Sequence, residues 1–339
     1  MVNRCGDTLL FEAPPVIAAG AAVGGKKESE GPLAAEFDEL SSDNRLGQSG
    51  WEAAETHLQL RAARLCLKKA ALPQEKVQLA LAGDLQAQCT ASSYAMRELG
   101  VPFAGVFGAC STMAEALGLG AVLCSSGAAR NLLAMASSHF CAAERQFRTP
   151  LSYGAVRTPT AQWTATAAGC AVLRKGAPKE KGLRITAGTL GRVVDYHIKD
   201  ANHMGAAMAP AVRDCIRAHF ADTGRKMGED YDYIFTGDLG WIGREILLEL
   251  LDECGLHVPP ERLIDCGASL FSKEQDPHAG GSGCGCVASV SCSWVMKRME
   301  QGEFSRALLV GSGAMLSPTS GMQGESIPSI AYAAGLEER

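Results

Sequence analysis

The chain has 339 residues, of which 47% are hydrophobic and 20% are charged. This balance is typical of a globular protein with a sizeable core and excludes an intrinsically disordered chain. The formal net charge of -5 gives no electrostatic reason to bind nucleic acid, so we expect neither DNA nor RNA as a partner. The 13 cysteines are an odd number spread along a long chain, which indicates a reducing compartment and excludes a secreted disulfide framework.

The N-terminal stretch VIAAGAAVGG, residues 16–25, has the composition of a signal-peptide core. Asp7 and Glu12 precede it, whereas a signal peptide carries positive charge there, so we interpret the stretch as part of the fold. No run reaches the roughly 20 apolar residues that a membrane-spanning helix needs. The sequence predicts a cytoplasmic-type soluble protein that reaches a membrane only through a surface or through partners.

Predicted helices and strands alternate along the first half of the chain. Residues 51–72 combine strong helix formers with apolar residues at helical spacing. Further along, runs typical of strands lie at 77–83, 103–108 and 130–138, and helical stretches lie at 92–99 and 111–127. This alternation predicts an α/β fold with a mostly parallel sheet that is covered by helices.

The same order of motifs returns in the second half. LAGDLQ at 81–86 is echoed by FTGDLG at 235–240, and each Gly-Asp-Leu follows a predicted strand. GAARNLLAMASS at 127–138 is echoed by FSRALLVGSGAM at 304–315. Repetition of a whole series of motifs indicates a duplicated α/β unit.

The boundary between the two units is predicted in the polar stretch 173–184, whose Pro, Gly and charges suit a linker. It divides the chain into an N-terminal half, residues 1–175, and a C-terminal half, residues 176–339. Two sheets that each need cover on both faces can share a central layer of helices. We therefore predict a five-layer αβαβα architecture, with the helix after Cys110 packed against the helix after Gly283.

The motif GACST places Cys110 at a strand-to-helix turn, at the bottom of the predicted cleft between the halves. Free N–H groups and the helix dipole stabilise a thiolate at such a turn, which makes Cys110 a candidate nucleophile. Cysteine is also among the residues most often buried in cores. The residues alone leave both interpretations open, a nucleophile or a small wall residue.

Three features resemble the thiolase and ketoacyl synthase superfamily: a cysteine that opens a buried helix, the stretch TATAAGCAVL before the mid-chain break, and a Gly-rich turn that opens the second-half helix. Within the superfamily, the chain is similar along essentially its whole length to the family of stage V sporulation protein AD from spore-forming bacteria. The segments that carry this similarity are LAGDL, FGACST, SSHFCAAERQFR, GRVVDYHIKDANHMGAAMAPA, TGDLG, AGGSGCGC and GAMLSPTS. The resemblance implies a thiolase-like, duplicated αβαβα five-layer fold.

The resemblance also implies a function, which is to bind dipicolinic acid during uptake of this pyridine dicarboxylate into the developing spore. Integral membrane proteins of the same uptake system are then expected as partners, because a soluble chain cannot itself carry a solute through a bilayer. Through these partners we expect a peripheral location at the spore inner membrane. The superfamily commonly pairs through the sheet edge of the first half, so we also expect a homodimer.

Condensing enzymes of the superfamily activate their cysteine with His and Asn, or with two His, from the second half. The stretches 235–240 and 279–286, where these partners are expected, contain neither residue, although His278 directly precedes the second stretch. Their composition favours a non-catalytic binding protein. The alternative is a Cys-dependent acyltransferase or ketoacyl synthase, which the retained Cys110 keeps open. His139 follows a predicted strand, where it could pair with Cys110 or have a structural role.

A planar dicarboxylate calls for bidentate cations, N–H groups and an apolar slot for its ring. Arg145 and Arg148, which flank Phe147, are the candidate cations, although arginines in loops are often solvated or paired. The helix start at Cys110 and Ser111 offers backbone N–H groups. We therefore predict that the ligand lies in the cleft near these residues.

The second-half turn contributes Gly281 and Ser282, where the backbone can approach a ligand closely. Asp84 and Asp238 lie at equivalent strand ends, so they could bind calcium if the ligand arrives as its calcium chelate, or else cap the helices that follow. No cofactor is expected, and calcium enters only with the ligand. No resident metal is expected either, because the Cys-x-Cys of this turn lacks the second spaced pair of a closed zinc site.

Overall fold

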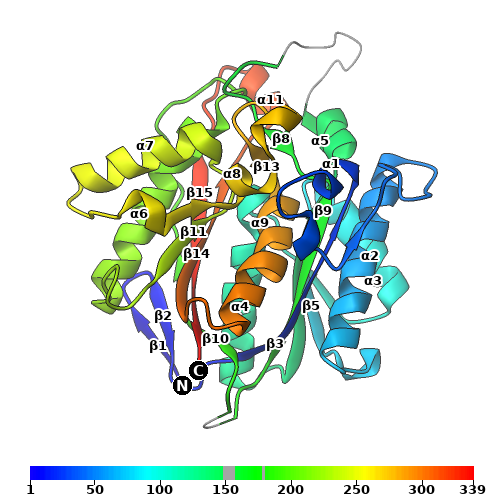
Figure 1. The fold of residues 1–339 in the computed structure, drawn as a ribbon, viewed down its shortest axis with the longest axis vertical. Coiled ribbons are helices and arrows are strands. Elements are labelled where there is room, and N and C mark those ends of the chain that lie inside the picture. The colour runs from blue at the N-terminus through cyan, green and yellow to red at the C-terminus, as the bar shows by residue number, and fades with distance from the viewer. Residues whose placement is uncertain (148–156, 178–179) are drawn as a thin grey trace.

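The structure, a computed structural model, describes residues 1–147, 157–177 and 180–339. Its main strands form two five-stranded units that meet in one continuous sheet (Figure 1). The strands of the first unit are β3 (Val16–Gly24), β5 (Leu79–Gly83), β6 (Phe103–Gly105), β7 (Asn131–Ser138) and β9 (Ala167–Arg174). The strands of the second unit are β10 (Leu183–Leu190), β11 (Tyr233–Thr236), β12 (Leu263–Asp265), β14 (Arg306–Ala314) and β15 (Ser329–Glu338).

Both units have the same strand order. The third strand along the chain lies at the edge, followed by the second, fourth, fifth and first strands. The second strand is parallel to the third and fourth, whereas the fifth is antiparallel to its neighbours. The units meet where β3 and β10 pair at Val16 and Arg184. This repeated topology confirms the predicted duplicated α/β fold.

The N-terminus adds strands to the second unit. β1 (Val2–Cys5) and β2 (Thr8–Phe11) form a hairpin, and β2 pairs with β10. The remaining short strands are β4 (Glu39–Leu40), which pairs with β3, and β8 (Trp163–Thr164), which pairs with β13 (Gly281–Ser282). The sequence did not indicate this hairpin. The predicted boundary at 175/176 lies in the connection between β9 and β10, and the division into two domains stays a prediction.

The helices form three of the five layers. Their bounds are α1 (Lys26–Ser29), α2 (Trp51–Lys69), α3 (Thr90–Leu99), α4 (Thr112–Ser126), α5 (Phe140–Phe147), α6 (Met204–Thr223), α7 (Gly240–Glu253), α8 (Cys266–Leu270), α9 (Cys284–Val290), α10 (Met296–Glu300) and α11 (Pro318–Met322). A π-helical turn, Ser291–Val295, continues α9 into α10. The helix predicted over 51–72 ends earlier, at Lys69.

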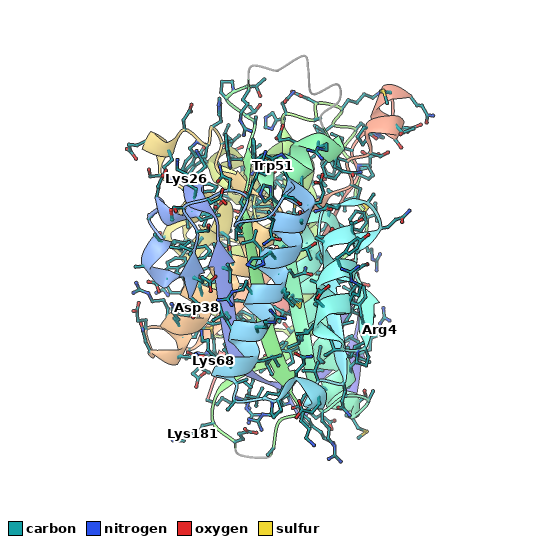
Figure 2. The ribbon with its side chains drawn as sticks, turned by 90° about the vertical axis from the view of Figure 1, so that its right-hand side faces the viewer. Arg4, Lys26, Asp38, Trp51, Lys68 and Lys181 are labelled. Atoms are coloured by element: carbon teal, nitrogen blue, oxygen red, sulfur yellow. The ribbon has the colours of Figure 1, made fainter. Side chains whose placement is uncertain are left out.

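The layers follow the predicted αβαβα order. α2 and α3 cover the outer face of the first unit, and α6 and α7 cover the outer face of the second. α4 and α9 lie between the two five-stranded units and contact each other (Figure 1). Figure 2 looks onto the first outer layer, with Trp51 and Lys68 labelled at the two ends of α2. The predicted contact between the two central helices is therefore confirmed.

Alternation along the strands assigns each residue to a layer. On β7, Leu133 and Met135 pack into the cluster beneath α2 and α3, whereas Leu132 and Ala134 pack into the central cluster around α4 and α9. Since successive side chains of a strand point to opposite faces, an uninterrupted apolar run supplies core residues to the helix layers on both faces of the sheet.

The central helix α4 is apolar all round because it is covered on both sides. With its preceding turn, the segment Ala109–Ser126 is long and apolar enough to cross a membrane, yet 61% of it is buried inside the protein. It packs against strands of both units. Burial between the two five-stranded units explains its composition.

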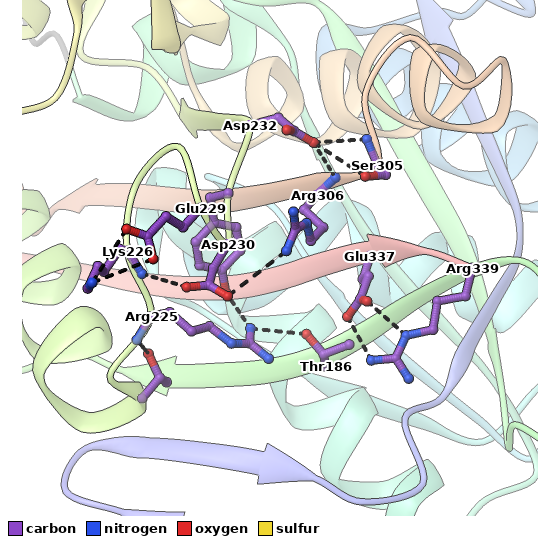
Figure 3. A network of polar contacts seen from close by, with 12 residues as sticks. Thr186, Arg225, Lys226, Glu229, Asp230, Asp232, Ser305, Arg306, Glu337 and Arg339 are labelled. Atoms are coloured by element: carbon purple, nitrogen blue, oxygen red, sulfur yellow. Dashed lines mark hydrogen bonds and ion pairs between the residues drawn. The ribbon is translucent and has the colours of Figure 1, made fainter.

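Polar contacts connect the segments that lead into β11 and β14 at one end of the second unit (Figure 3). Asp232 Oδ2 accepts the backbone N–H groups of Ser305 and Arg306 at 3.0 and 2.9 Å. The Arg306 guanidinium lies 3.9 Å from Asp230 Oδ1, with both side chains partly exposed. Arg306, the first residue of β14, therefore has a structural role far from the end where the two Gly-Asp-Leu motifs lie.

Replacement of Gly169 tests the close packing of α9 on β9. A Cβ at Gly169 would lie 2.1 Å from the carbonyl oxygen of Ala288. We expect Gly169→Ala to lower the free energy of unfolding by about 1–3 kcal/mol, since the backbone of α9 must move. Thermal and denaturant unfolding measure this loss.

Gly118→Ala is the matched control. Gly118 lies in α4, and a Cβ at this position would meet no described atom within 4 Å. Alanine is the better helix former, so this variant should gain about 0.5–1 kcal/mol. Equal stability of the Gly169→Ala variant and the wild type would contradict the close packing of α9 on β9.

Candidate functional site

A cavity of about 810 Å³ opens between the two halves, at the carboxyl ends of β5 and β14. Large apolar side chains in its lining include Phe107, Phe147, Met204 and Leu316. Polar side chains in its lining include Cys110, Glu144, Gln162, Thr164, Asn202 and Ser282. Both halves contribute, and the volume is that of pockets that enclose a small molecule, roughly 300–1,000 Å³.

A sharp turn brings Cys110 to the wall of this cavity. The chain leaves β6 and enters a short 3-10 turn, Ala109–Ser111, in which Ala109 has a φ of 51°. Hydroxyl groups hold the turn: Ser111 donates to the carbonyl of Gly108 at 2.6 Å, and Thr112 donates to that of Ala109 at 2.7 Å. Ser111 is therefore buried and committed to the turn, and its side chain does not line the cavity.

The thiol of Cys110 lies beside the carboxyl group of Asp238. Asp238 accepts the N–H of Gly283 at 2.8 Å and the hydroxyl of Ser312 at 3.0 Å. Burial, with Asp238 as the nearest negative charge, raises the pKa of the Cys110 thiol well above its usual value. Burial also raises the pKa of Asp238 to about 7. At neutral pH the thiol is protonated and is a poor nucleophile.

His139 is not placed to activate Cys110. It is buried, its Nε2 donates to the carbonyl of Asn44 at 2.8 Å, and its Nδ1 accepts the N–H of Cys141 at 3.1 Å. Its ring lies 5.5 Å from that of Trp51. Burial lowers the pKa of His139, so both nitrogens of a neutral ring serve the fold. His139 does not line the cavity.

His278, the other histidine near the predicted site, lies 3.9 Å from Asp276, measured from Nε2 to Oδ1. It too is outside the cavity lining, so the described part of the lining contains no histidine.

Of the two candidate arginines, Arg145 lies within the described residues and Arg148 does not. Arg145 is half-exposed and pairs with Glu52 of α2 at 3.0 Å, away from the cavity. The residues of α5 that line the cavity are its neighbours Ala143, Glu144, Gln146 and Phe147. Arg148 lies outside the described residues. A ligand contact by either arginine stays a prediction.

Asp84 caps the start of α3. Its Oδ1 accepts the N–H of Gln86 at 2.9 Å, and its Oδ2 accepts the N–H and the hydroxyl of Ser92 at 2.8 and 2.6 Å. Asp84 is buried outside the cavity lining. All of these partners lie on the segment that directly follows Asp84. These contacts match helix capping, one of the two roles that the sequence left open for Asp84.

The cap of α7 comes from Asp265, a residue outside the sequence motifs. Its carboxyl group accepts the N–H groups of Leu239 and Gly240 at 2.8 and 2.9 Å and the hydroxyl of Thr236 at 2.7 Å. Asp238 is thereby free to face Cys110. In the sequence, the one feature that could have indicated this role is that Asp265 directly follows the apolar run 263–264.

The Gly-rich turn of the second half supports the site mainly through its backbone. Gly283 has a φ of 97°, and a Cβ there would lie 2.7 Å from Ser138 Oγ, so glycine lets its N–H reach Asp238. Gly281 is buried beside Phe271, whereas Ser282 lines the cavity. Among the described residues, no cluster of three or more His, Cys, Asp or Glu could hold a metal ion.

Gln162 is a second residue of the site that no sequence motif contains. Its Nε2 donates to the carbonyl of Asp238 at 2.6 Å and lies 3.4 Å from the carbonyl of Gly281, so it joins the two second-half segments that flank Cys110. It lies between the described end of α5 and β8 in a stretch with no regular pattern. Its position at the cavity wall follows only from the folded chain.

The sequence profile of the stage V sporulation protein AD family matches residues 5–337 of this chain. The chain belongs to this family. It is 40% identical to stage V sporulation protein AD of Bacillus subtilis strain 168 over 331 residues, which are 98% of this chain and 96% of that protein. The resemblance inferred from the sequence motifs is therefore confirmed at the level of the family.

Solved structures with the same fold include condensing enzymes. 3-Oxoacyl-[acyl-carrier-protein] synthase III of Aquifex aeolicus VF5 superimposes with a TM-score of 0.59 at 13% identity and covers 95% of this chain and 99% of its own. The FabH enzyme of Pseudomonas aeruginosa PAO1 has a TM-score of 0.59 at 18% identity, covering 96% and 98%. Cerulenin-bound OleA of Xanthomonas campestris has a TM-score of 0.62 at 16% identity, covering 97% and 99%. These likenesses confirm the thiolase-like fold.

Thiol alkylation tests the contact between Cys110 and Asp238. In Asp238→Asn, the amide can keep its oxygen on Gly283 and turn an N–H donor toward the sulfur, which stabilises the thiolate. We expect iodoacetamide at pH 8 to modify Cys110 about tenfold faster in this variant than in the wild type, equivalent to a thiol pKa lower by about one unit. Mass spectrometry of the labelled peptides measures the rate.

Cys5, which is exposed, is the internal control and should react equally in both proteins. An unchanged rate at Cys110 would show that Asp238 does not suppress the thiolate.

Proposed function

We propose that this protein is a non-catalytic binding protein for dipicolinic acid, taken up as its calcium chelate, in the supply of dipicolinate to the developing spore. The observation that carries the proposal is the burial of the Cys110 thiol beside the Asp238 carboxyl group at the cavity wall, which raises the pKa of the thiol. A condensing enzyme needs a thiolate and side chains that donate hydrogen bonds at this place. Here the neighbour of the thiol is the carboxyl group of Asp238, a hydrogen-bond acceptor. This neighbour disfavours the thiolate and does not serve as the required donor. Membership of a sporulation protein family supports the biological role.

The lining suits a planar aromatic ligand that carries a cation. Phe107, Phe147 and Met204 provide apolar surface for a ring. Glu144 and neutral oxygen-bearing side chains provide the polar part. The carboxylate of Glu144 lies 3.9 Å from the Arg157 guanidinium, so it adds little net charge to the cavity. A free dipicolinate dianion must lose its hydration there, whereas its calcium chelate is neutral and presents a hard cation to these oxygens. The chemistry of the lining therefore favours the chelate over the free dianion.

Partners follow from the proposed role in uptake. Passage through a bilayer requires integral membrane proteins, so we propose that this chain acts at the spore inner membrane through such partners. A homodimer stays a proposal as well. The edge strand β6 has exposed residues at Ala104 and Gly105, and Phe107 beyond it is also exposed, which is compatible with strand pairing between two copies.

Calorimetry tests the choice of ligand. We expect the calcium chelate of dipicolinate to bind at least about tenfold more tightly than dipicolinate in the presence of a calcium chelator, because the chelate enters the partly apolar cavity without net charge. Cys110→Ala should bind like the wild type, since the thiol lies beside Asp238. Tighter binding of the free dianion would overturn the preference for the chelate, and absence of binding by both forms would overturn the proposed function.

Arg145→Ala and Arg148→Ala test the two candidate arginines in the same experiment. A true charge-assisted contact is worth roughly 1.5–3 kcal/mol, so its loss weakens binding about tenfold or more. The ion pair between Arg145 and Glu52 predicts that Arg145→Ala leaves the affinity unchanged. A tenfold loss in this variant would mean that Arg145 leaves Glu52 to bind the ligand.

The second candidate function is a Cys-dependent acyltransferase or ketoacyl synthase, which the position of Cys110 on the cavity wall supports. With acyl-CoA we expect no multiple turnover, since a protonated thiol without an acid–base partner loses several kcal/mol of transition-state stabilisation. Release of free CoA under steady-state conditions is the measurement. Repeated turnovers that vanish in Cys110→Ala would favour the enzyme.

A further inference from the structure

Exposed cations without a partner gather at one end of the first unit. They lie on α2, on the segment before β5, on the turn before β7 and on the connection between β9 and β10. Each is exposed and makes no ion pair, cation–π contact or side-chain hydrogen bond within the described residues. We call this group the basic rim: Arg64, Lys68, Lys76, Arg130, Lys175 and Lys181. Among the other described cations, only Lys26 and Lys199 share both properties.

Three segments of the basic rim lie side by side at the amino ends of β5 and β7. The N–H of Lys175 donates to the carbonyl of Arg130 at 2.9 Å, and Asn131 Nδ2 donates to the carbonyl of Lys76 at 3.4 Å. Neighbouring strands of a sheet are about 4.8 Å apart, so these segments place their cations along one edge of the sheet.

The end of α2 extends this edge. Lys181 lines a hollow together with Lys69, the last residue of α2. Figure 2 shows Lys68 and Lys181 near the same end of the molecule, with Trp51 toward the other end. The basic rim is therefore one continuous region and not a set of scattered charges.

Helix dipoles account for only part of the basic rim. A helix C-terminus attracts cations, which explains Lys68 at the end of α2. It also explains Lys175, because a Cβ on Gly127, the last cap of α4, would lie 3.6 Å from Lys175 Nζ. Arg130 and Lys181 lie in connections between elements, where no helix end requires a cation.

Few acidic side chains offset these cations. On the segments of the basic rim, Glu75 is exposed and makes no ion pair within the described residues, whereas Glu180 pairs with Arg174. Glu300 and Glu338 line the hollow beside Lys181 and limit the basic rim on that side. The basic rim is thus a surface of net positive charge on a chain whose formal net charge is -5.

A surface of phosphate groups suits such a region. Anionic phospholipids attract exposed cations without any need for a pocket. Single-stranded nucleic acid instead stacks its bases on aromatic side chains. Segments 68–78, 125–131 and 173–183, which carry most of the basic rim, contain no Phe, Tyr or Trp. Their composition, on a chain that is acidic as a whole, favours a lipid surface over nucleic acid.

We propose that the basic rim binds the headgroups of anionic phospholipids and holds the protein on a membrane surface. This inference rests on the proposed location at a membrane, adds a direct lipid contact to it, and does not depend on binding of dipicolinate. Acidic groups elsewhere on the chain lie beyond the screening length of about 8 Å at physiological salt when the basic rim faces the lipid. Because the basic rim lies at the amino end of β5 and the cavity opens at its carboxyl end, the cavity then faces away from the lipid.

Co-sedimentation with vesicles tests the lipid contact. We expect the wild type to bind vesicles that contain anionic phosphatidylglycerol and not vesicles of neutral phosphatidylcholine alone. Binding should weaken as salt is raised, because salt screens exposed charges. Equal binding to both kinds of vesicle, or no binding to the anionic ones, would overturn the proposal.

Two matched double variants locate the contact. Lys76→Gln with Lys175→Gln removes two cations of the basic rim, and we expect the vesicle partition coefficient to fall about 25-fold. This is about fivefold for each cation, equivalent to about 1 kcal/mol. Lys26→Gln with Lys199→Gln removes the same charge outside the basic rim and should bind like the wild type. Equal losses in the two double variants would mean a general effect of charge and would overturn the role of the basic rim.

The outcomes separate this inference from the proposed function. Both double variants should bind dipicolinate like the wild type, since the basic rim and the cavity lie at opposite ends of β5. If the wild type binds dipicolinate but no anionic vesicles, the lipid contact fails and the binding function remains. If it binds the vesicles but not dipicolinate, the binding function fails and the lipid contact remains. Tighter binding to a DNA or RNA oligonucleotide than to the anionic vesicles would overturn the assignment to lipid.

Discussion

The buried carboxyl group of Asp238 is the contact on which the arrangement of the site depends. It joins the turn that carries Cys110 in the first half to the N–H of Gly283 and the hydroxyl of Ser312 in the second half. A carboxyl group is costly to bury, and its hydrogen bonds offset this cost only while all of these segments are in place. The contact therefore fixes the relative position of the two halves at the cavity.

The same contact determines the chemistry that the cavity can support. A thiol buried beside a carboxyl group is stabilised in its protonated form, which is the reverse of what a nucleophile needs. The chain shares its fold with solved synthases, while burial beside Asp238 raises the pKa of the Cys110 thiol. The described lining of the cavity combines apolar surfaces with neutral oxygens, and its carboxylate, Glu144, lies 3.9 Å from Arg157.

Much of the fold was predictable because its signals are local. The apolar runs at β5, β7, β11 and β14 and the two Gly-Asp-Leu motifs at strand ends require no knowledge of distant contacts. Alternation of side chains then assigns residues such as Leu132 and Leu133 to different layers. The N-terminal hairpin escaped prediction because its partner, β10, lies more than half the chain away.

The site was less predictable because identical local motifs have different partners in space. Asp84 and Asp238 occupy the same place in the repeat, yet the first caps α3 through Ser92, and the second faces Cys110 because Asp265 has taken over the cap of α7. The sequence was equally unable to predict the partner of Arg145, because α5 places this side chain next to Glu52 of α2. A duplicated fold repeats its strand ends, whereas the side chain that approaches from the other half decides whether a strand-end carboxylate supports a helix or controls a thiol.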